Sequence, residues 1–247
     1  MNQGYKYLFL LVFTVGTLVS LAQDTIPLTD TSIAPTNPIL PKTNNLFSAR
    51  LSFTSPNPIS NKAFNKSFVG IYQVDGSMNM SLYKGIYVGV AFSYASLKIN
   101  KNLTGAMYNV GLTPAQTNEA NASMSIYNAA IKIGGDFYIG EKNRMILSPA
   151  ISVGQSYVKY SSFVCKDSAK HIQITDFKSP YVQTDISMIF LIEPNWGIGP
   201  TISYSLIKRN FDPTELCLED WGVNKSNSSA TQYFSFGVVC HYSFGKK

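Results

Sequence analysis

The residues best suited to catalysis are two histidines, the only two in the 247-residue chain. His241 lies two positions before Ser243, a spacing in which an imidazole base could activate a hydroxyl nucleophile. His171 lies close to Asp167 and Ser168, but a lone histidine in a polar loop is more often solvated than catalytic. No HExxH, CxxC, P-loop or dinucleotide-binding GxGxxG pattern occurs in a suitable context. The sequence therefore predicts no catalytic residue, no cofactor and no enzymatic activity.

Four acidic residues lie in the stretch 209–229, namely Asp212, Glu215, Glu219 and Asp220. Carboxylates bind calcium when several of them converge on one ion at a suitable spacing. These four lack that spacing. We therefore predict no metal site and interpret the stretch as a solvated loop.

Most of the chain alternates apolar and polar side chains with a period of two, which indicates β-strands. In the segment 230–244, for example, Phe236 and Val238 alternate with Ser235 and Gly237. The predicted strands are 46–55, 67–82, 86–98, 124–139, 144–160, 179–192, 197–208 and 230–244.

Short and long connections alternate between these strands. The short ones are about 83–85, 140–143 and 193–196; the long ones are about 56–66, 99–123, 161–178 and 209–229. Outer-membrane barrels show this alternation, with short turns in the periplasm and long loops outside. The predicted fold class is therefore all-β: an eight-stranded antiparallel up-and-down transmembrane β-barrel.

The composition agrees with this fold. Charged residues make up 14% of the chain, as expected for a barrel whose outer wall faces lipid. The net charge of +6 is spread along the chain without a dense Lys/Arg run, so we predict no nucleic-acid partner.

The chain begins with features of an exported protein. Residues 1–22 combine Lys6, an apolar run and a small-residue exit at Ser20-Leu21-Ala22, as in a cleaved signal peptide. The proline-rich stretch 23–45 predicts a linker, which leaves 46–247 for the barrel.

Several polar residues on the strands would point into the barrel. Arg50 and Asp75 lie on neighbouring strands in near register, and Lys132 and Asp136 lie four residues apart on one face. Buried charges need partners, so we expect one mutually hydrogen-bonded network that plugs the lumen. A proton or ion path is the alternative. The predicted lumenal residues are Arg50, Gln73, Asp75, Lys132, Asp136, Asp185 and His241, with Asn128 and Gln183 beside them.

The opposite faces of the strands would contact lipid. In the second strand this face includes Phe68, Tyr72 and Met78. Aromatic residues gather at the ends of the apolar faces like two interfacial girdles, although aromatic residues favour strands in any protein.

Cys165 and Cys217 both fall in long connections on the same predicted side of the barrel. Disulfides persist in exported proteins, so we predict a bond between these two cysteines. Cys240 lies on the lipid face of the last strand, out of reach. Three free thiols are the alternative.

Residues 46–247 resemble the small outer-membrane β-barrel proteins, the OmpX-like and OmpA-transmembrane-like barrels of the porin family. The resemblance rests on the export signal, the alternating strands and the aromatic-rich segment 233–244. It implies a place in the bacterial outer membrane after Sec-type export. It does not imply a pore, because barrels of this size usually have a filled interior.

The resemblance also implies that the outer-membrane assembly machinery reads the last strand. The residues concerned are Phe234, Phe236, Tyr242 and Phe244. The tail 245–247 departs from the pattern, because related chains typically end on the aromatic residue.

The predicted function is that of a non-enzymatic barrel with a plugged polar lumen. Its extracellular loops would recognise an unknown ligand or support the cell envelope, with minor solute passage as a variant. The predicted partners are outer-membrane lipid, the assembly machinery and that extracellular ligand. One alternative is a secreted lipocalin-like carrier with the same strands inside out. The other is a lipid-modifying enzyme, because the spacing of His241 and Ser243 is similar to that of a lipid A deacylase family, although they lie at the wrong end for that substrate.

Overall fold

The computed structural model describes residues 45–59, 61–83, 85–103, 123–139, 144–161, 165 and 175–246. The predicted signal segment and nearly all of the predicted linker lie outside these residues, as do His171, Asp167 and Ser168. The proposals for them therefore stay predictions. No helix in the described part of the chain is both long and apolar enough to span a membrane.

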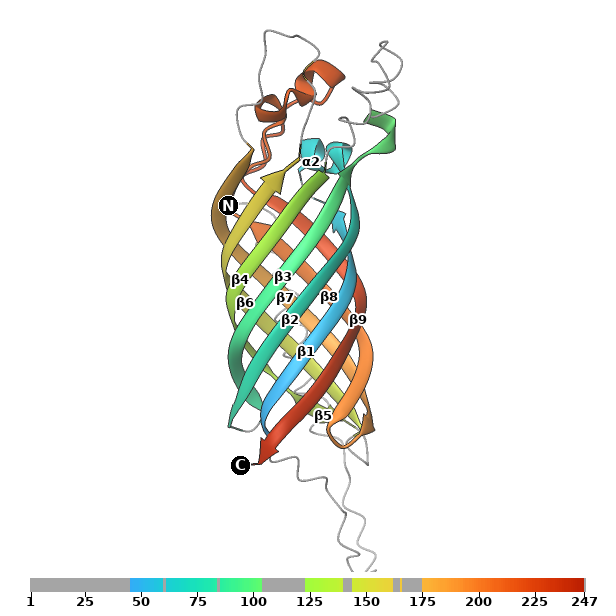
Figure 1. Ribbon diagram of the computed structural model, residues 1–247, viewed down its shortest axis with the longest axis vertical. Helices are drawn as coiled ribbons and strands as arrows, with labels where there is room; N and C mark the ends of the chain where they lie inside the picture. Colours follow the sequence, from blue (N-terminus) through green and yellow to red (C-terminus); the bar gives the residue numbers. More distant parts are fainter. Residues whose placement is uncertain are drawn as a thin grey trace, which may run out of the picture. The chain divides into compact units, whose positions relative to one another are not determined.

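The described residues form nine β-strands in one antiparallel sheet (Figure 1). The strands are β1 (Asn45–Pro58), β2 (Phe68–Tyr83), β3 (Ile86–Ile99), β4 (Ser123–Gly135), β5 (Phe137–Ile139), β6 (Met145–Tyr160), β7 (Asp176–Glu193), β8 (Trp196–Ile207) and β9 (Thr231–Lys246). Their order is β4-β3-β2-β1-β9-β8-β7-β6, and a further pairing of β4 with β6 closes the ring. The short β5 continues β4 along the same edge of β6. The prediction of an eight-stranded antiparallel barrel is confirmed.

Two prolines account for interruptions in the hydrogen-bonded ladder, because proline has no N–H to donate. Pro149 in β6 faces the break between β4, which ends at Gly135, and β5, which begins at Phe137. Pro200 lies in β8 where the pairing with β7 is interrupted. The wall stays closed at Pro200 because the same residue still pairs with β9.

The two ends of the barrel have different connections. At one end, which we call the turn end, β2 joins β3 through a tight turn at Gly85 (φ 84°), and β7 joins β8 through residues 194–195. At the other, the cap end, α2 (Lys62–Ser67) connects β1 to β2, and η1 (Pro213–Leu216) and η2 (Leu218–Trp221) lie between β8 and β9. Figure 1 shows these helical segments gathered at the end opposite the C-terminus.

The predicted loops 56–66 and 209–229 thus contain short helices. Asn61 Oδ1 accepts a hydrogen bond from Phe64 N at 3.1 Å and caps α2. Asp212 Oδ1 accepts from Thr214 N at 3.1 Å and caps η1. Such side-chain caps satisfy backbone donors that a helix leaves free, so these polar residues, interpreted as loop residues, start helical turns.

Side chains alternate between the two faces of the wall. In β4, Ile131 is 62% exposed and Ile133 59%, whereas Lys132 between them is 8% exposed. The barrel therefore has an apolar exterior and contains charged residues inside, the reverse of a soluble protein.

The predicted outward position of Phe68 is wrong. Its side chain is 1% exposed and lies inside the barrel. The pairing of β2 with β3 passes from Gly70 directly to Tyr72, so Ile71 is an extra residue, and Ile71 and Tyr72 both face outward. One extra residue reverses the alternation beyond it, which turns Phe68 inward.

Candidate functional site

Arg50 of β1 is the centre of the polar interior near the turn end. Its guanidinium donates to Asp136 Oδ1 at 2.5 Å, Tyr87 Oη at 2.7 Å and Ser148 Oγ at 2.6 Å. Its Nε donates to His241 Nδ1 at 3.3 Å, and the guanidinium lies 4.7 Å from the centroid of the Tyr87 ring. These partners come from β3, β6, β9 and the junction of β4 and β5. One buried side chain therefore links much of the wall.

Two hydrogen bonds cross the full width of the lumen. In the ring of eight positions, β1 and β6 are opposite each other, and so are β4 and β9. Arg50 joins the first pair through Ser148, and Asn128 Nδ2 joins the second by donating to Tyr233 Oη at 3.4 Å. Side chains that meet across the axis leave no continuous path there.

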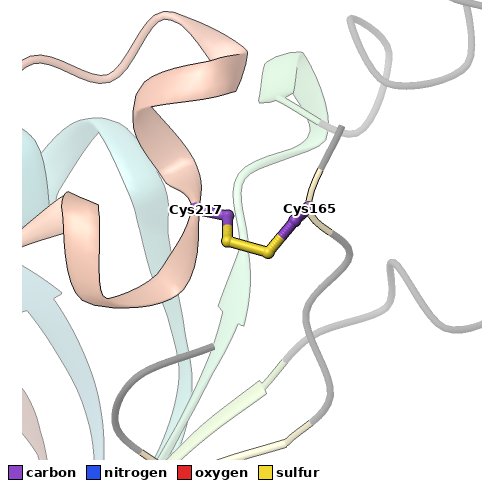
Figure 2. The surroundings of a disulfide bond; sticks show 2 residues. All are labelled: Cys165 and Cys217. Carbon is purple, nitrogen blue, oxygen red and sulfur yellow. A yellow bond between two sulfur atoms is a disulfide. The ribbon is translucent and has the colours of Figure 1, made fainter. Parts of the chain in front are cut away.

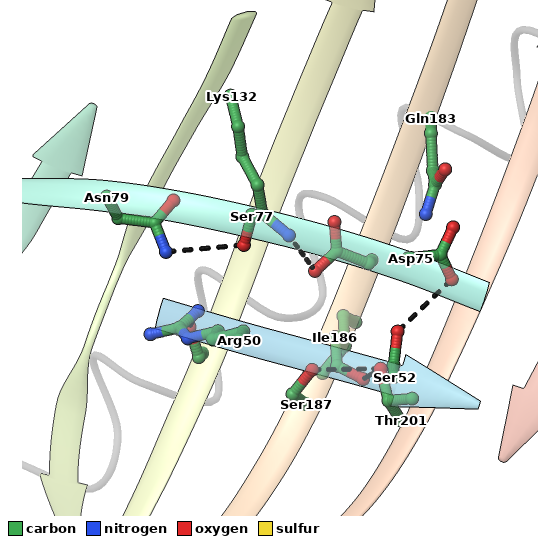
Figure 3. Close-up of polar contacts among 12 residues, drawn as sticks. Arg50, Ser52, Asp75, Ser77, Asn79, Lys132, Gln183, Ile186, Ser187 and Thr201 are labelled. Carbon is green, nitrogen blue, oxygen red and sulfur yellow. Dashed lines mark hydrogen bonds and ion pairs between the residues drawn. The ribbon is translucent and has the colours of Figure 1, made fainter. Parts of the chain in front are cut away.

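Other polar pairs line the wall between these crossings. Lys132 Nζ of β4 lies 3.0 Å from Asp185 Oδ1 of β7, and both side chains are buried. Asp75 of β2 accepts hydrogen bonds from Gln73 Nε2 at 2.6 Å and Ser52 Oγ at 3.1 Å. Figure 3 shows the Lys132 ammonium and the Asp75 carboxylate directed into the same interior space.

The ion pairs differ from those that sequence proximity suggested. Arg50 pairs with Asp136 rather than Asp75, and Lys132 pairs with Asp185 rather than Asp136. In the register of β1 and β2, Arg50 lies opposite Ser77. Long cationic side chains extend across a narrow lumen, so their partners lie on strands that are not adjacent to their own in the ring.

A cavity of about 40 Å³ remains beside these pairs, enough for about three water molecules. Four polar atoms of its lining residues have no hydrogen-bond partner within the described part of the chain, namely Thr54 Oγ1, Asn128 Oδ1, Asp185 Oδ2 and Ser203 Oγ. Buried polar atoms of this kind are normally satisfied by ordered water. The chemistry of this space is hydration rather than binding of a larger solute.

The cap end of the lumen is filled by apolar side chains instead. Residues from the strand ends, α2 and the segment 211–223 pack into one buried cluster, which we call the apolar plug. Phe68 lies against Phe211, with ring centroids 5.5 Å apart, and Phe64 lies 5.7 Å from Phe211. The plug comprises Ala63, Phe64, Phe68, Ala95, Leu97, Ile99, Leu103, Met124, Ile126, Val158, Tyr160, Tyr181, Ile207, Phe211, Leu216, Leu218, Trp221, Val223 and Tyr233.

The segment 208–230, which we call the cap, supplies part of this plug, and several contacts hold it in place. A disulfide joins Cys217, between η1 and η2, to Cys165 in the connection after β6 (Figure 2). Arg209 pairs with Glu215 at 3.0 Å and lies 4.2 Å from the centroid of the Phe177 ring. The two bonded cysteines are 52 residues apart in the sequence. Cys240, on the wall, is unpaired.

A second ion pair closes the cap on its own surface, between Asp212 and Lys225. Partial burial would by itself raise the pKa of Asp212, but hydrogen bonds from Lys225 and Thr214 outweigh this effect and lower it. The same contact raises the pKa of Lys225. The pair is therefore charged at neutral pH.

The candidate catalytic residues have structural partners. His241 Nδ1 accepts from Arg50, while Ser243 Oγ accepts from Asn45 Nδ2 at 2.7 Å and lies 3.5 Å from Asn195 O. Because His241 Nδ1 already accepts a hydrogen bond from the Arg50 guanidinium, this nitrogen is poorly placed to take a proton from a hydroxyl. Among the described residues, no group of three His, Cys, Asp or Glu side chains could hold a metal ion.

Sequence reasoning missed Tyr87, Ser148 and the apolar plug. The alternation places Tyr87 on the same face as Gly89, so its inward direction was available from the pattern. The plug also left a signal, because Leu97 and Ile126 occupy inward positions near long connections. The packing of η1 and η2 on them had no such signal, since the cap follows no period.

No protein-family model matches the chain, and no curated protein matches it in sequence. Solved structures of similar fold include neisserial surface protein A, with 11% identity, a TM-score of 0.46, and coverage of 80% of this chain and 97% of that one. Ail, the attachment invasion locus protein of Yersinia pestis, shows 12% identity, a TM-score of 0.39, and coverage of 79% and 97%. The outer-membrane protease OmpT of Escherichia coli shows 10% identity, a TM-score of 0.38, and coverage of 87% and 100%. These values concern the fold, so the function below is argued from the geometry of this chain.

Proposed function

We propose that this chain spans the bacterial outer membrane as a closed, non-enzymatic barrel that acts through its cap end. The observation that carries the proposal is the reversed distribution of side chains. Ion pairs such as Arg50–Asp136 and Lys132–Asp185 are inside, while Phe92 is 62% exposed and Ile131 equally so on the outer wall. In water, such a wall would be strongly unfavourable, whereas in lipid it is stabilised.

Two aromatic girdles on the outer wall support the proposal that this wall faces lipid. Near the cap end, Tyr72, Tyr94, Tyr127 and Tyr157 form a continuous belt on the outer wall, with neighbouring ring centroids 5.0–6.2 Å apart. Near the turn end, the rings of Phe47, Tyr242 and Phe244 stack, and Trp196 and Phe137 are exposed on other strands.

The spacing of the girdles fits a membrane. Tyr127 on β4 and Phe137 on β5 are ten residues apart, and β5 continues β4 along the same edge of β6. At a rise of about 3.3 Å per residue and a tilt of about 40°, this is about 25 Å along the membrane normal. The apolar band of outer-membrane barrels has about this height.

The lipocalin alternative requires the opposite arrangement, with an apolar pocket inside and charges outside. The interior cavity of this barrel instead has room for about three waters. The polar crossings and the apolar plug argue against a wide pore. We therefore assign the function to the surface of the cap end. We place this end outside the cell because it carries the long connections.

We further propose that β9 is the segment recognised during assembly. It closes the wall by pairing with both β1 and β8, and Phe236 and Tyr242 point outward. Removal of 245–247 should leave assembly intact, whereas removal of 242–247 should leave unassembled protein in the periplasm. SDS-resistant barrel from the longer truncation would contradict this proposal.

The test of the membrane proposal is fractionation of expressing cells, followed by gel electrophoresis of heated and unheated samples. A closed hydrogen-bonded barrel should be recovered with outer membranes and migrate differently until it is boiled. Recovery in the soluble fraction alone would refute the proposal and favour the lipocalin alternative.

A further inference from the structure

Four lysines lie on the outer wall at the cap end, and we call them the rim lysines: Lys98, Lys159, Lys178 and Lys208. All four are exposed. The alternation of the strands sets their direction, because Lys98 lies between the buried Leu97 and Ile99, and Lys159 between the buried Val158 and Tyr160. These four neighbouring side chains point into the barrel, so Lys98 and Lys159 point outward.

The rim lysines lie directly beside the tyrosine belt. Lys178 pairs in register with Tyr157, and Lys159 is two residues beyond Tyr157 on β6. Lys98 is four residues beyond Tyr94 on β3. These offsets place the lysine backbones about 0–10 Å from the belt along the membrane normal. A tyrosine belt marks the level of lipid headgroups, and a lysine side chain reaches several ångströms toward that level.

The four positions occupy one continuous sector of the wall. β3, β4, β6, β7 and β8 are neighbours in the ring, and Lys208 N donates to Pro180 O of β7 at 2.9 Å. Over β9, β1 and β2, by contrast, exposed strand residues near the cap end include Asn57, Val69 and Ile71, and the exposed Lys62 and Lys66 lie on α2 rather than on a strand. The rim lysines of the wall are therefore grouped on one side of the barrel.

Hydroxyl groups lie among these lysines. Ser125 Oγ is 3.4 Å from Tyr94 Oη, and Ser123 and Ser161 hydrogen-bond to each other at 2.9 Å. Asp176 lies in the same sector and accepts from Tyr157 Oη at 2.6 Å, so one carboxylate opposes the lysines. Ammonium and hydroxyl groups both donate hydrogen bonds, and a phosphate group offers several acceptor oxygens. This combination therefore suits a phosphate group rather than an apolar ligand.

We propose that the rim lysines form a binding site for the phosphate groups of lipid headgroups in the leaflet around the cap end. This inference rests on the proposed membrane location and deepens it, because it gives the barrel a preferred lipid on one side. Lysines at a membrane surface each contribute about 1 kcal/mol of attraction to anionic headgroups, which corresponds to about a fivefold change in affinity.

The test uses the full chain in phosphatidylcholine nanodiscs that contain a small fraction of fluorescent phosphatidic acid. The double variant Lys159→Gln/Lys178→Gln should bind this lipid about 25-fold more weakly than the unaltered chain. The matched control is Lys62→Gln/Arg144→Gln, which removes two exposed charges, one on α2 and one before β6. The control should bind like the unaltered chain, and Lys159→Arg/Lys178→Arg should retain most of the affinity.

Equal affinity of the two double variants would overturn the proposal. So would displacement of the lipid by inorganic phosphate at equal concentration, because the site would then take free phosphate. Failure of the unaltered chain to enter nanodiscs at all, with migration that does not depend on heat, would instead refute the membrane location and this inference with it.

Discussion

The two halves of the lumen are closed by different interactions, hydrogen bonds and ion pairs in one and apolar packing in the other. Near the turn end, the Arg50 cluster fills the space with hydrogen bonds of 2.5–3.3 Å to four residues, three on strands and Asp136 between β4 and β5. Near the cap end, the apolar plug fills it with aromatic and aliphatic side chains. The polar half depends on each partner being present, since an unpaired buried charge is costly. The apolar half depends on filled volume, which substitutions of similar size preserve.

This difference gives the two halves different tolerance to mutation. A conservative change at the cap end should be absorbed by neighbouring side chains. A comparable change in the polar half leaves a donor or acceptor without a partner. The predictions below test this contrast, and where a loss of stability is predicted it is measured as the free energy of unfolding in lipid vesicles.

Arg50→Met should have the largest effect, a loss of about 3–5 kcal/mol, because it leaves the partly buried Asp136 without its cation and removes the hydrogen bonds to Tyr87, Ser148 and His241. Urea unfolding followed by intrinsic fluorescence measures this loss. Lys62→Met, at an exposed position of α2, is the control and should stay within about 0.5 kcal/mol. Matching midpoints for the two variants would mean that Arg50 does not hold the polar half together.

Cys217→Ser should cost up to about 4 kcal/mol in the chain-entropy model, because the disulfide closes a span of 52 residues. The loss should be local, with faster hydrogen exchange in η1, η2 and the apolar plug but not around Arg50. Cys240→Ser removes an unpaired thiol and should change neither quantity. Uniformly faster exchange through the whole barrel would contradict the separation into two halves.

Lys132→Met should cost about 3 kcal/mol because Asp185 loses its cation. Adding Asp185→Leu should restore most of that loss, since neither buried charge then remains. A double-mutant cycle measures the coupling. Additive losses would show that the two residues act independently and that the observed pair carries no stability.

Phe64→Leu should cost only about 1 kcal/mol, although Phe64 is fully buried in the apolar plug. Asp136→Asn changes shape less, yet should cost about 2 kcal/mol because it weakens charged hydrogen bonds. The ratio of the two losses sharpens the comparison. A larger loss for Phe64→Leu would reverse the assignment of which half depends on individual partners.

The smallest effect concerns pH at the cap. The pKa of Asp212 is lowered, so its contribution to stability is complete above the ordinary carboxyl pKa and is lost as pH falls through the lowered value. Lys225→Gln should move this pKa upward, because it removes the hydrogen bond that lowers it. Carboxyl NMR titration in detergent measures the change, and an unchanged pKa would show that the pair does not form in solution.

The sequence predicted the wall better than the contents of the barrel. Alternation in β4 and β9 predicted strand positions to within a few residues, because the period of two is a local property. The inward direction of Phe68 depends on the bulge at Ile71, which alternation alone does not reveal. The pairing of Arg50 with Asp136 depends on which strands face each other across the closed ring, and this follows from closure rather than from neighbouring residues.

The central claim is that the outer wall faces lipid while the charges lie inside, and brominated lipids test it directly. In a Trp196→Phe/Trp221→Phe background, Ile131→Trp places one fluorophore in the middle of the apolar band. Lipids brominated deep in the acyl chain should quench it strongly. Native Trp196, kept alone at the turn-end girdle, should respond more to bromine near the headgroup, and native Trp221, kept alone in the cap, should respond to neither. If brominated lipid left the fluorescence of the Ile131→Trp variant unchanged, this result would contradict the account.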